Sequence, residues 1–284
     1  MSLFQALILG AVQGLTEFVP VSSTAHLFLV QALMGIPNDA IALSFDIVLH
    51  LGTVAALVVS TRKELAAMVE EAAAWVRREP PRDRTARALI LPLAVGTIPG
   101  VLAGLFLLKR FEAMRSVALI GASMLVACGW FFFSEGVAAH RRGRERALGD
   151  IRVADGLWIG VAQAAAGLMA GLSRSGFTIA TGKLRRFDRP DAARFSFLLA
   201  LPIILGAGAK ALLDLRKVSG PGPGVAVLSA GFAAAAVVGY FAIEVLLKFL
   251  RTHSLRPFGV YLGLLGIVLL LVAFVPAFAP VLAR

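Results

Sequence analysis

Two short stretches of this chain hold polar and ionisable side chains within otherwise apolar sequence. Residues 13–26 contain a glutamine, a glutamate, serines and a histidine, and residues 171–178 contain an arginine between two serines. Together they supply a carboxylate, hydroxyls, an imidazole and a guanidinium. A hydroxyl beside a base can act as a nucleophile, and a guanidinium binds phosphate oxygens through its planar fork of donors. This combination indicates chemistry on a phosphate group.

The candidate catalytic residues are Glu17, Ser23, His26 and Arg174. His26 follows Ser23 by three residues, which on a helix is close enough to be its base or a separate acid. Gln13 precedes Glu17 by four residues, so both share a helix face. These residues could also have purely structural roles. Arg174 and Glu17 could form a salt bridge that joins the two segments, Gln13 could form an interhelical hydrogen bond, and His26 could be an ordinary core histidine. Ionisable groups at membrane depth are, however, costly and usually functional.

The side chains expected to bind phosphate oxygens are Ser22, Thr24, Ser173, Ser175 and Thr178. Ser22 or Ser23 is expected to cap the helix that carries His26. Ser173 is expected to cap the helix that carries Thr178. The free N–H groups and positive dipole ends at two such helix starts would form an anion site.

The composition indicates which elements hold these residues. Hydrophobic residues make up 58% and charged residues 16% of the chain, and the mean hydropathy is +0.84, which predicts an integral membrane protein. Six stretches can cross a bilayer of about 30 Å; they lie at about 43–60, 88–108, 116–134, 195–213, 225–247 and 258–280. The net charge of +11 comes from short basic runs between these stretches, as in cytoplasmic loops, so nucleic acid is not an expected partner.

Segments 2–34 and 154–182 are apolar at their flanks and polar in the middle. Proline, glycine and serine break each into half-helices of about 15 residues, about 23 Å long, which are too short to span. If both are re-entrant hairpins, one side of the membrane carries 20 Lys and Arg and the other 7, whereas eight full spans give 16 and 11. The sharper asymmetry favours hairpins, with the basic loops in the cytoplasm and both termini outside.

The chain also contains an internal repeat. The pattern of residues 10–23 returns at 160–173, a displacement of 150, which aligns Ser23 with Ser173. We predict a single membrane domain, 1–284, with repeat one at about 1–134, a cytoplasmic linker at about 135–152 and repeat two at about 153–280. Each repeat has an odd number of crossings, so the copies are inverted and the hairpin tips meet near the midplane. The expected fold is an all-α polytopic membrane protein.

The stretches QGLTEFVPVSSTAH (13–26) and GLSRSGFT (171–178) closely resemble the two signature motifs of the undecaprenyl-diphosphate phosphatase family, the BacA-type bacitracin-resistance proteins. The similarity extends through RFSFLLALPIILGA (194–207) and LRPFGVY (255–261). It implies hydrolysis of a C55 isoprenyl diphosphate to the monophosphate carrier of cell-wall synthesis. The site would open to the periplasm from the bacterial inner membrane. The partners expected are this lipid and membrane lipids, and a homodimer is left open.

The resemblance further implies a divalent cation, Mg²⁺ or Ca²⁺, with Glu17 as ligand and Gln13 as a second candidate. The family's functional residues correspond to Glu17, Ser23, His26 and Arg174. Three positions depart from the family pattern: Gln13 replaces a common glutamate, Ala170 a proline and Leu262 an arginine.

The favoured mechanism is attack by Ser23 on the terminal phosphorus, with His26 handling the proton and Glu17 holding the metal or acting as base. Direct attack by water is left open. The alternative function is a polyprenyl-phosphate flippase or secondary transporter, which would share the inverted-repeat architecture. A cluster of serine, histidine, glutamate and arginine is richer than anion binding alone requires, and this favours an enzyme.

Overall fold

The computed structural model describes residues 1–37, 40–107, 116–141, 144–215 and 223–274, and this part of the chain is helical, without strands. Its helices are α1 (Leu3–Phe18), α2 (Ser23–Leu33), α3 (Ala40–Ser60), α4 (Arg62–Val76), α5 (Arg84–Phe106), α7 (Val117–His140), α8 (Val153–Leu168), α9 (Arg174–Leu184), α10 (Arg189–Leu215), α11 (Val225–Leu250), α12 (Arg256–Phe274) and a short 3-10 helix, η1 (Leu148–Asp150).

Six helices of the described part, α3, α5, α7, α10, α11 and α12, are long and apolar enough to cross a membrane. The predicted all-α membrane fold with six spans is therefore confirmed. The predicted span ends at 108 and 280 lie outside the described residues. The repeat boundaries stay a prediction, although α7 continues to His140, past the predicted linker start at about 135.

The segment between α3 and α5 is more ordered than a loop, because it contains α4. The Glu71 side chain, 3% exposed, accepts hydrogen bonds from the backbone N–H groups of Arg82 and Asp83, each at 2.8 Å, and from Arg87 Nε at 2.9 Å. These bonds lower the pKa of the Glu71 carboxyl below its usual value, with the Asp83 N–H as the largest cause. The Glu71 carboxylate thus joins α4 to the residues that precede α5 and to the first turn of α5.

Each hairpin breaks for a local reason. Pro20 cannot continue α1, and Val19 before it adopts extended backbone (φ −63°, ψ 134°), so the helix ends at Phe18. The second hairpin turns without proline because Gly171 adopts φ +103°, a conformation that side chains disfavour. A Cβ atom at Gly171 would also lie 2.5 Å from the Ile120 carbonyl oxygen.

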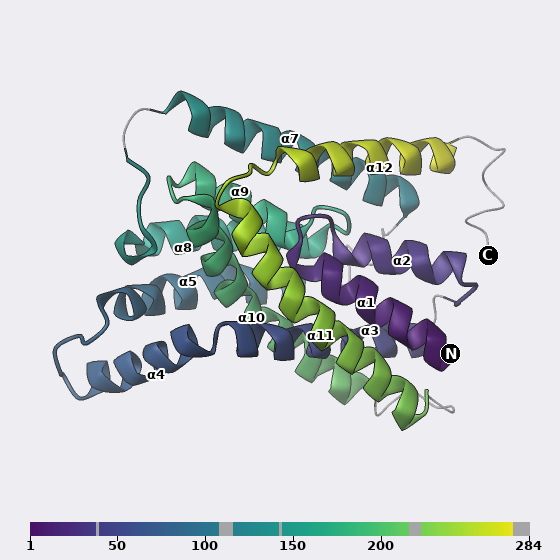
Figure 1. Ribbon diagram of the computed structural model, residues 1–284, viewed down its shortest axis with the longest axis horizontal. Helices are drawn as coiled ribbons and strands as arrows, with labels where there is room; N and C mark the ends of the chain where they lie inside the picture. Colours follow the sequence, from purple (N-terminus) through teal and green to yellow (C-terminus); the bar gives the residue numbers. More distant parts are fainter. Residues whose placement is uncertain (38–39, 108–115, 142–143, 216–222, 275–284) are drawn as a thin grey trace.

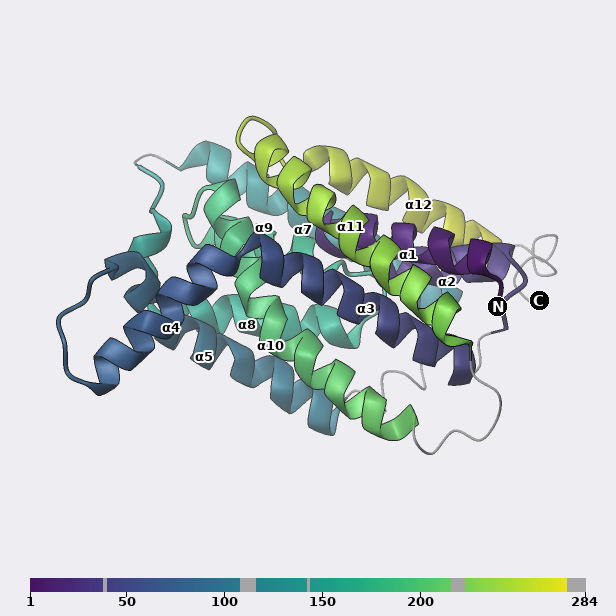
Figure 2. The ribbon, with the colours of Figure 1, turned by 60° about the horizontal axis from the view of Figure 1, so that its bottom comes forward.

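The two hairpins enter the molecule from opposite ends (Figure 1). Met1 and the end of α12 lie at one end, while α4, η1 and the start of α8 lie at the other, and Figure 2 shows the same arrangement after rotation. Helix packing repeats with the halves exchanged: α1 packs on α11 and α8 on α5, and α7 packs on α12. Gly10 and Gly160, equivalent in the repeat, each approach a backbone carbonyl of the partner helix, at Gly231 and Gly96.

Candidate active site

The two hairpin tips share an unusual backbone conformation. Ser22 precedes α2 with φ 72°, and Ser173 precedes α9 with φ 57°. Positive φ is uncommon outside glycine and gathers at functional sites. Neither hydroxyl caps its helix, so the capping prediction is wrong; a capping side chain normally extends from β-region backbone. The first N–H groups of both helices are therefore not occupied by a serine cap.

The repeat alignment shifts by one residue at the tips. The first helices, α1 and α8, are 150 residues apart, but α2 starts at Ser23 and α9 at Arg174, because the second turn is one residue longer. The expected alignment of Ser23 with Ser173 is wrong. Ser23 instead corresponds to Arg174, and Ser22 to Ser173.

Glu17, at the end of α1, lies between the two tips. Its Oε1 atom accepts a hydrogen bond from Arg174 Nη2 at 2.5 Å. Its Oε2 atom accepts from the Ser23 hydroxyl at 2.6 Å and from the Gln13 amide nitrogen at 2.9 Å. The Glu17 side chain is 5% exposed, so a buried carboxylate joins both hairpins. Four of the predicted residues thus meet, and Glu17 is placed to receive the Ser23 proton.

Arg174 retains donors for a ligand. Within the described residues its side chain contacts Glu17 through Nη2, and it is 16% exposed. A guanidinium has five N–H groups, so others stay available to phosphate oxygens. The salt bridge that could give Arg174 a purely structural role is present, but it uses only part of the hydrogen-bond donors of the guanidinium.

The His26 ring is directed to partners other than Ser23. Its Nδ1 atom is 2.8 Å from the Ser22 carbonyl oxygen, and its Nε2 atom is 2.6 Å from the Tyr261 hydroxyl. Because a carbonyl only accepts, Nδ1 carries a proton, and in the neutral ring Nε2 accepts the Tyr261 O–H. Both ring nitrogens are thereby engaged away from Ser23. The geometry does not support His26 as the base of Ser23.

Sequence reasoning missed two residues of this site. Tyr261, on α12, stacks on His26 with ring centroids 5.7 Å apart. His50, on α3, places Nε2 3.7 Å from Glu17 Oε2 while its Nδ1 lies 2.7 Å from the Asp46 carbonyl oxygen. The usable signal for His50 was an ionisable side chain inside a predicted span. Tyr261 lay in a stretch quoted only for its similarity.

The remaining predicted phosphate ligands differ in their surroundings. The Thr178 hydroxyl is fully buried and donates to the Arg174 carbonyl oxygen at 2.8 Å, beside Ser196 Oγ at 2.5 Å. Ser175 is 2% exposed, with only a long contact, 3.5 Å, to the Val19 carbonyl oxygen. The Ser173 hydroxyl is buried and has no hydrogen-bond partner within the described part of the chain. The Thr178 hydroxyl thus bonds within the protein, whereas the Ser173 hydroxyl has no partner among the described residues. Phosphate binding by Ser22, Thr24, Ser173, Ser175 and Thr178 stays a prediction.

Comparison with known proteins decides the family. The family described as "Bacitracin resistance protein BacA" matches residues 6–268. The chain belongs to the BacA family. An "Undecaprenyl-diphosphatase" of Rubrobacter xylanophilus is 40% identical over 265 residues, covering 92% of this chain and 94% of the relative. A protein of the same name from Desulforudis audaxviator is 39% identical over 276 residues, covering 96% and 98%. "Undecaprenyl-diphosphatase 1" of Streptomyces avermitilis is 36% identical over 268 residues, covering 94% of each chain.

The side-chain oxygen atoms of Glu17 and Gln13 are of the kind that binds a divalent cation together with a substrate phosphate. No group of three His, Cys, Asp or Glu in the described part could hold a metal alone. Glu17 nevertheless offers a carboxylate, and the Gln13 side chain beside it has a buried Oε1 atom with no hydrogen-bond partner among the described residues. Mg²⁺ is usually held by one or two carboxylates together with substrate phosphates and water. Glu17 and Gln13 therefore suit a Mg²⁺ or Ca²⁺ ion that binds together with a diphosphate.

Proposed function

We propose that this chain is a membrane hydrolase that converts undecaprenyl diphosphate into undecaprenyl phosphate and inorganic phosphate. It thereby recycles the lipid carrier of cell-wall synthesis and confers bacitracin resistance. The observation that carries the proposal is the buried Glu17 carboxylate, which contacts Ser23 through one oxygen and Arg174 through the other. Family membership and the names of the relatives support the same activity. They do not favour the flippase or transporter alternative.

In the proposed first step, Ser23 Oγ attacks the terminal phosphorus. The Oγ–P bond forms, the bond from phosphorus to the bridging oxygen breaks, undecaprenyl phosphate leaves, and Glu17 takes the hydroxyl proton. The free N–H groups of Arg174 and of the starts of α2 and α9 hold the charge on the phosphoryl oxygens. A divalent cation held by Glu17 and Gln13 would neutralise diphosphate charge when bound.

In the second step, water cleaves the phosphoserine. Glu17 has by then given the proton from the first step to the departing undecaprenyl phosphate. It takes a proton from the attacking water and passes it to Ser23 Oγ as the Oγ–P bond breaks and inorganic phosphate leaves. His26 supplies a proton to the leaving oxygen of the first step only when both ring nitrogens are protonated, because in the neutral ring Nδ1–H is bonded to the Ser22 carbonyl oxygen and Nε2 accepts from Tyr261. The prenyl tail can stay in the bilayer because only the head must reach the hairpin tips.

We place this site in the bacterial inner membrane, open to the periplasm, with both termini on that side. The support is the distribution of basic residues: the described parts of the connections, which carry most of the 20 Lys and Arg, lie toward the end of the molecule opposite Met1 (Figure 2). Cytoplasmic loops carry such an excess.

The deciding experiment is phosphate release from undecaprenyl or farnesyl diphosphate by the purified protein in detergent. We expect phosphate release with Mg²⁺ or Ca²⁺, loss of release with EDTA, and loss of nearly all release in Glu17→Gln. The proposal fails if no metal supports release while the protein moves labelled prenyl phosphate across proteoliposomes.

A further inference from the structure

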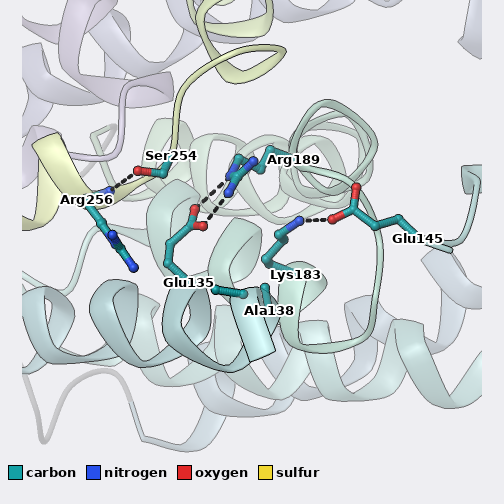
Figure 3. Close-up of a pocket in the computed structure, with 8 residues that line it drawn as sticks. Glu135, Ala138, Glu145, Lys183, Arg189, Ser254 and Arg256 are labelled. Atoms are coloured by element: carbon teal, nitrogen blue, oxygen red, sulfur yellow. Dashed lines mark hydrogen bonds and ion pairs between the residues drawn. The ribbon is translucent and has the colours of Figure 1, made fainter. Parts of the chain in front are cut away.

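A charged cavity lies at the end of the molecule opposite Met1. It encloses about 300 Å³ between the ends of α7 and α9, the start of α10 and the segment that enters α12 (Figure 3). Its polar lining consists of Glu135, Glu145, Lys183, Arg189, Ser254 and Arg256. Arg174 and Lys183 stand at the two ends of α9, about 14 Å apart along the helix axis. The cavity is therefore distinct from the Glu17 site.

One acidic wall of the cavity is already neutralised. Arg189 donates to Glu135 through Nε at 2.8 Å and through Nη2 at 2.5 Å. The Leu255 N–H donates to the same carboxylate at 2.9 Å, and the Glu135 side chain is 3% exposed. This closed arrangement explains Glu135 and Arg189 as structural residues, and it neutralises the Glu135 carboxylate, which would otherwise repel an anion.

Lys183 is held differently. Its side chain is 3% exposed, yet the carboxylate that pairs with it belongs to Glu145, which is 52% exposed. A buried ammonium without a counterion is strongly destabilised, so something negative must occupy the position of Glu145. Because water reaches Glu145, an anion that enters the cavity can replace its carboxylate and leave Lys183 paired.

Arg256 supplies a second cation. It is exposed, lines the same cavity and, among the described residues, forms no ion pair. Figure 3 shows no dashed line from its guanidinium to the other residues drawn. The Ser254 hydroxyl accepts from the Arg256 N–H at 3.4 Å and can still donate. With Glu145 displaced, three cations would face one carboxylate.

We propose that this cavity binds a phosphate-bearing anion, either free phosphate or the headgroup of an anionic phospholipid, with Lys183, Arg256 and Ser254 as donors. Basic pockets between membrane helices on the cytoplasmic side bind anionic lipid headgroups. The Glu145 carboxylate competes with this anion for Lys183, so the anion must displace it to bind. The proposal does not depend on the hydrolytic activity.

The test measures binding to the purified full chain in a neutral detergent and phosphate-free buffer. The probes are radiolabelled inorganic phosphate, by equilibrium dialysis, and short-chain phosphatidylglycerol against phosphatidylcholine, by native mass spectrometry. We expect Arg256→Gln to weaken anion binding at the cavity about tenfold or more, the effect of losing one charge-assisted contact. Glu145→Gln should tighten it several-fold, because the competing carboxylate is gone. A merely structural role for Glu145 would not increase affinity.

Arg251→Gln is the matched control, since it removes an exposed cation near the same end but outside the cavity lining. Lys183→Gln is a second test of the same site. Because Lys183 is buried, this substitution can unfold the chain, so the exposed Arg256→Gln stays the main test. Both Arg variants should keep diphosphate hydrolysis at the wild-type level, which separates this site from the Glu17 site.

The two sources of phosphate give different results. If phosphatidylglycerol displaces labelled phosphate and phosphatidylcholine does not, the ligand is a lipid headgroup; if only inorganic phosphate binds, it is a soluble anion. The proposal is overturned if Arg256→Gln and Glu145→Gln bind like the wild type, or if Arg251→Gln weakens binding equally.

Discussion

Ser23 and Arg174 occupy the same position in the two hairpins: each is the first residue of an 11-residue helix that follows a serine with positive φ. Both donate to Glu17, one to each carboxylate oxygen. Two similar tips therefore present a hydroxyl on one side and a guanidinium on the other. This difference turns an approximate repeat into a single asymmetric site.

Removing either charge of the Glu17–Arg174 pair should nearly abolish turnover. We expect Glu17→Gln and Arg174→Ala each to lose on the order of 10² or more in kcat, because each acts on transition-state charge in a site shielded from water. Glu244→Gln is the matched control and should hydrolyse normally. Near-normal activity of correctly folded Arg174→Ala would restore the purely structural salt bridge.

Ser23→Ala distinguishes the two mechanisms. It should abolish hydrolysis yet leave diphosphate binding largely intact, because Arg174 and backbone N–H groups carry most of the binding. Acid quenching with labelled substrate should trap phosphate on the wild type and none on Ser23→Ala. Ser134→Ala, a buried serine on α7, is the control. Substantial turnover by Ser23→Ala would indicate direct attack by water activated by Glu17.

Tyr261→Phe tests whether the hydroxyl on α12 positions His26. It removes one oxygen atom and releases His26 Nε2, so we expect kcat to fall about tenfold, the value of roughly one hydrogen bond. KM should change little. Tyr240→Phe, the other tyrosine of the chain, is the control. If His26→Ala lowers kcat while Tyr261→Phe does not, His26 acts without this support.

The orientation can be tested by cysteine labelling in intact cells. Cys128 is the only cysteine, so Cys128→Ser provides a clean background. A cysteine at the exposed position Pro37 should react with an impermeant reagent from outside, whereas one at the exposed position His253 should react only after permeabilisation. Labelling of His253 from outside in intact cells would contradict the proposed topology.

Glu71 should make the α4–α5 connection sensitive to acid. Its folded-state pKa lies below the usual value because N–H donors surround the carboxylate. The contribution of the ionised Glu71 carboxylate to the free energy of unfolding is therefore fully present above the unfolded pKa of about 4.5. It is lost as the pH falls through the lower folded-state pKa. We expect Glu71→Gln to lower Tm at pH 7. We also expect the Tm of this variant to fall less than that of the wild type when the pH is lowered. Its exposed neighbour provides the control, since Glu70→Gln should change neither.

Several features of this protein follow from the sequence alone because they depend on neighbouring residues. A span is a matter of apolar run length, so all six were found, although α7 continues to His140 and α10 begins at Arg189, beyond the predicted limits. The break after Phe18 follows from Pro20, which cannot continue a helix. Motif similarity brought together Glu17, Ser23 and Arg174, which the structure places in contact.

Only the tertiary structure decided which partners these residues meet. His26 and Tyr261 are 235 positions apart, so no local spacing could reveal that the tyrosine, rather than Ser23, takes the imidazole nitrogen. His50 approaches Glu17 because α3 packs beside α1. The extra residue in the second turn could not be predicted either, because one more position in a loop leaves the hydropathy pattern unchanged. It nevertheless changes which side chain faces the site, since adjacent side chains on a helix are about 100° apart. Long-range packing and backbone register, which local pattern does not encode, set these contacts.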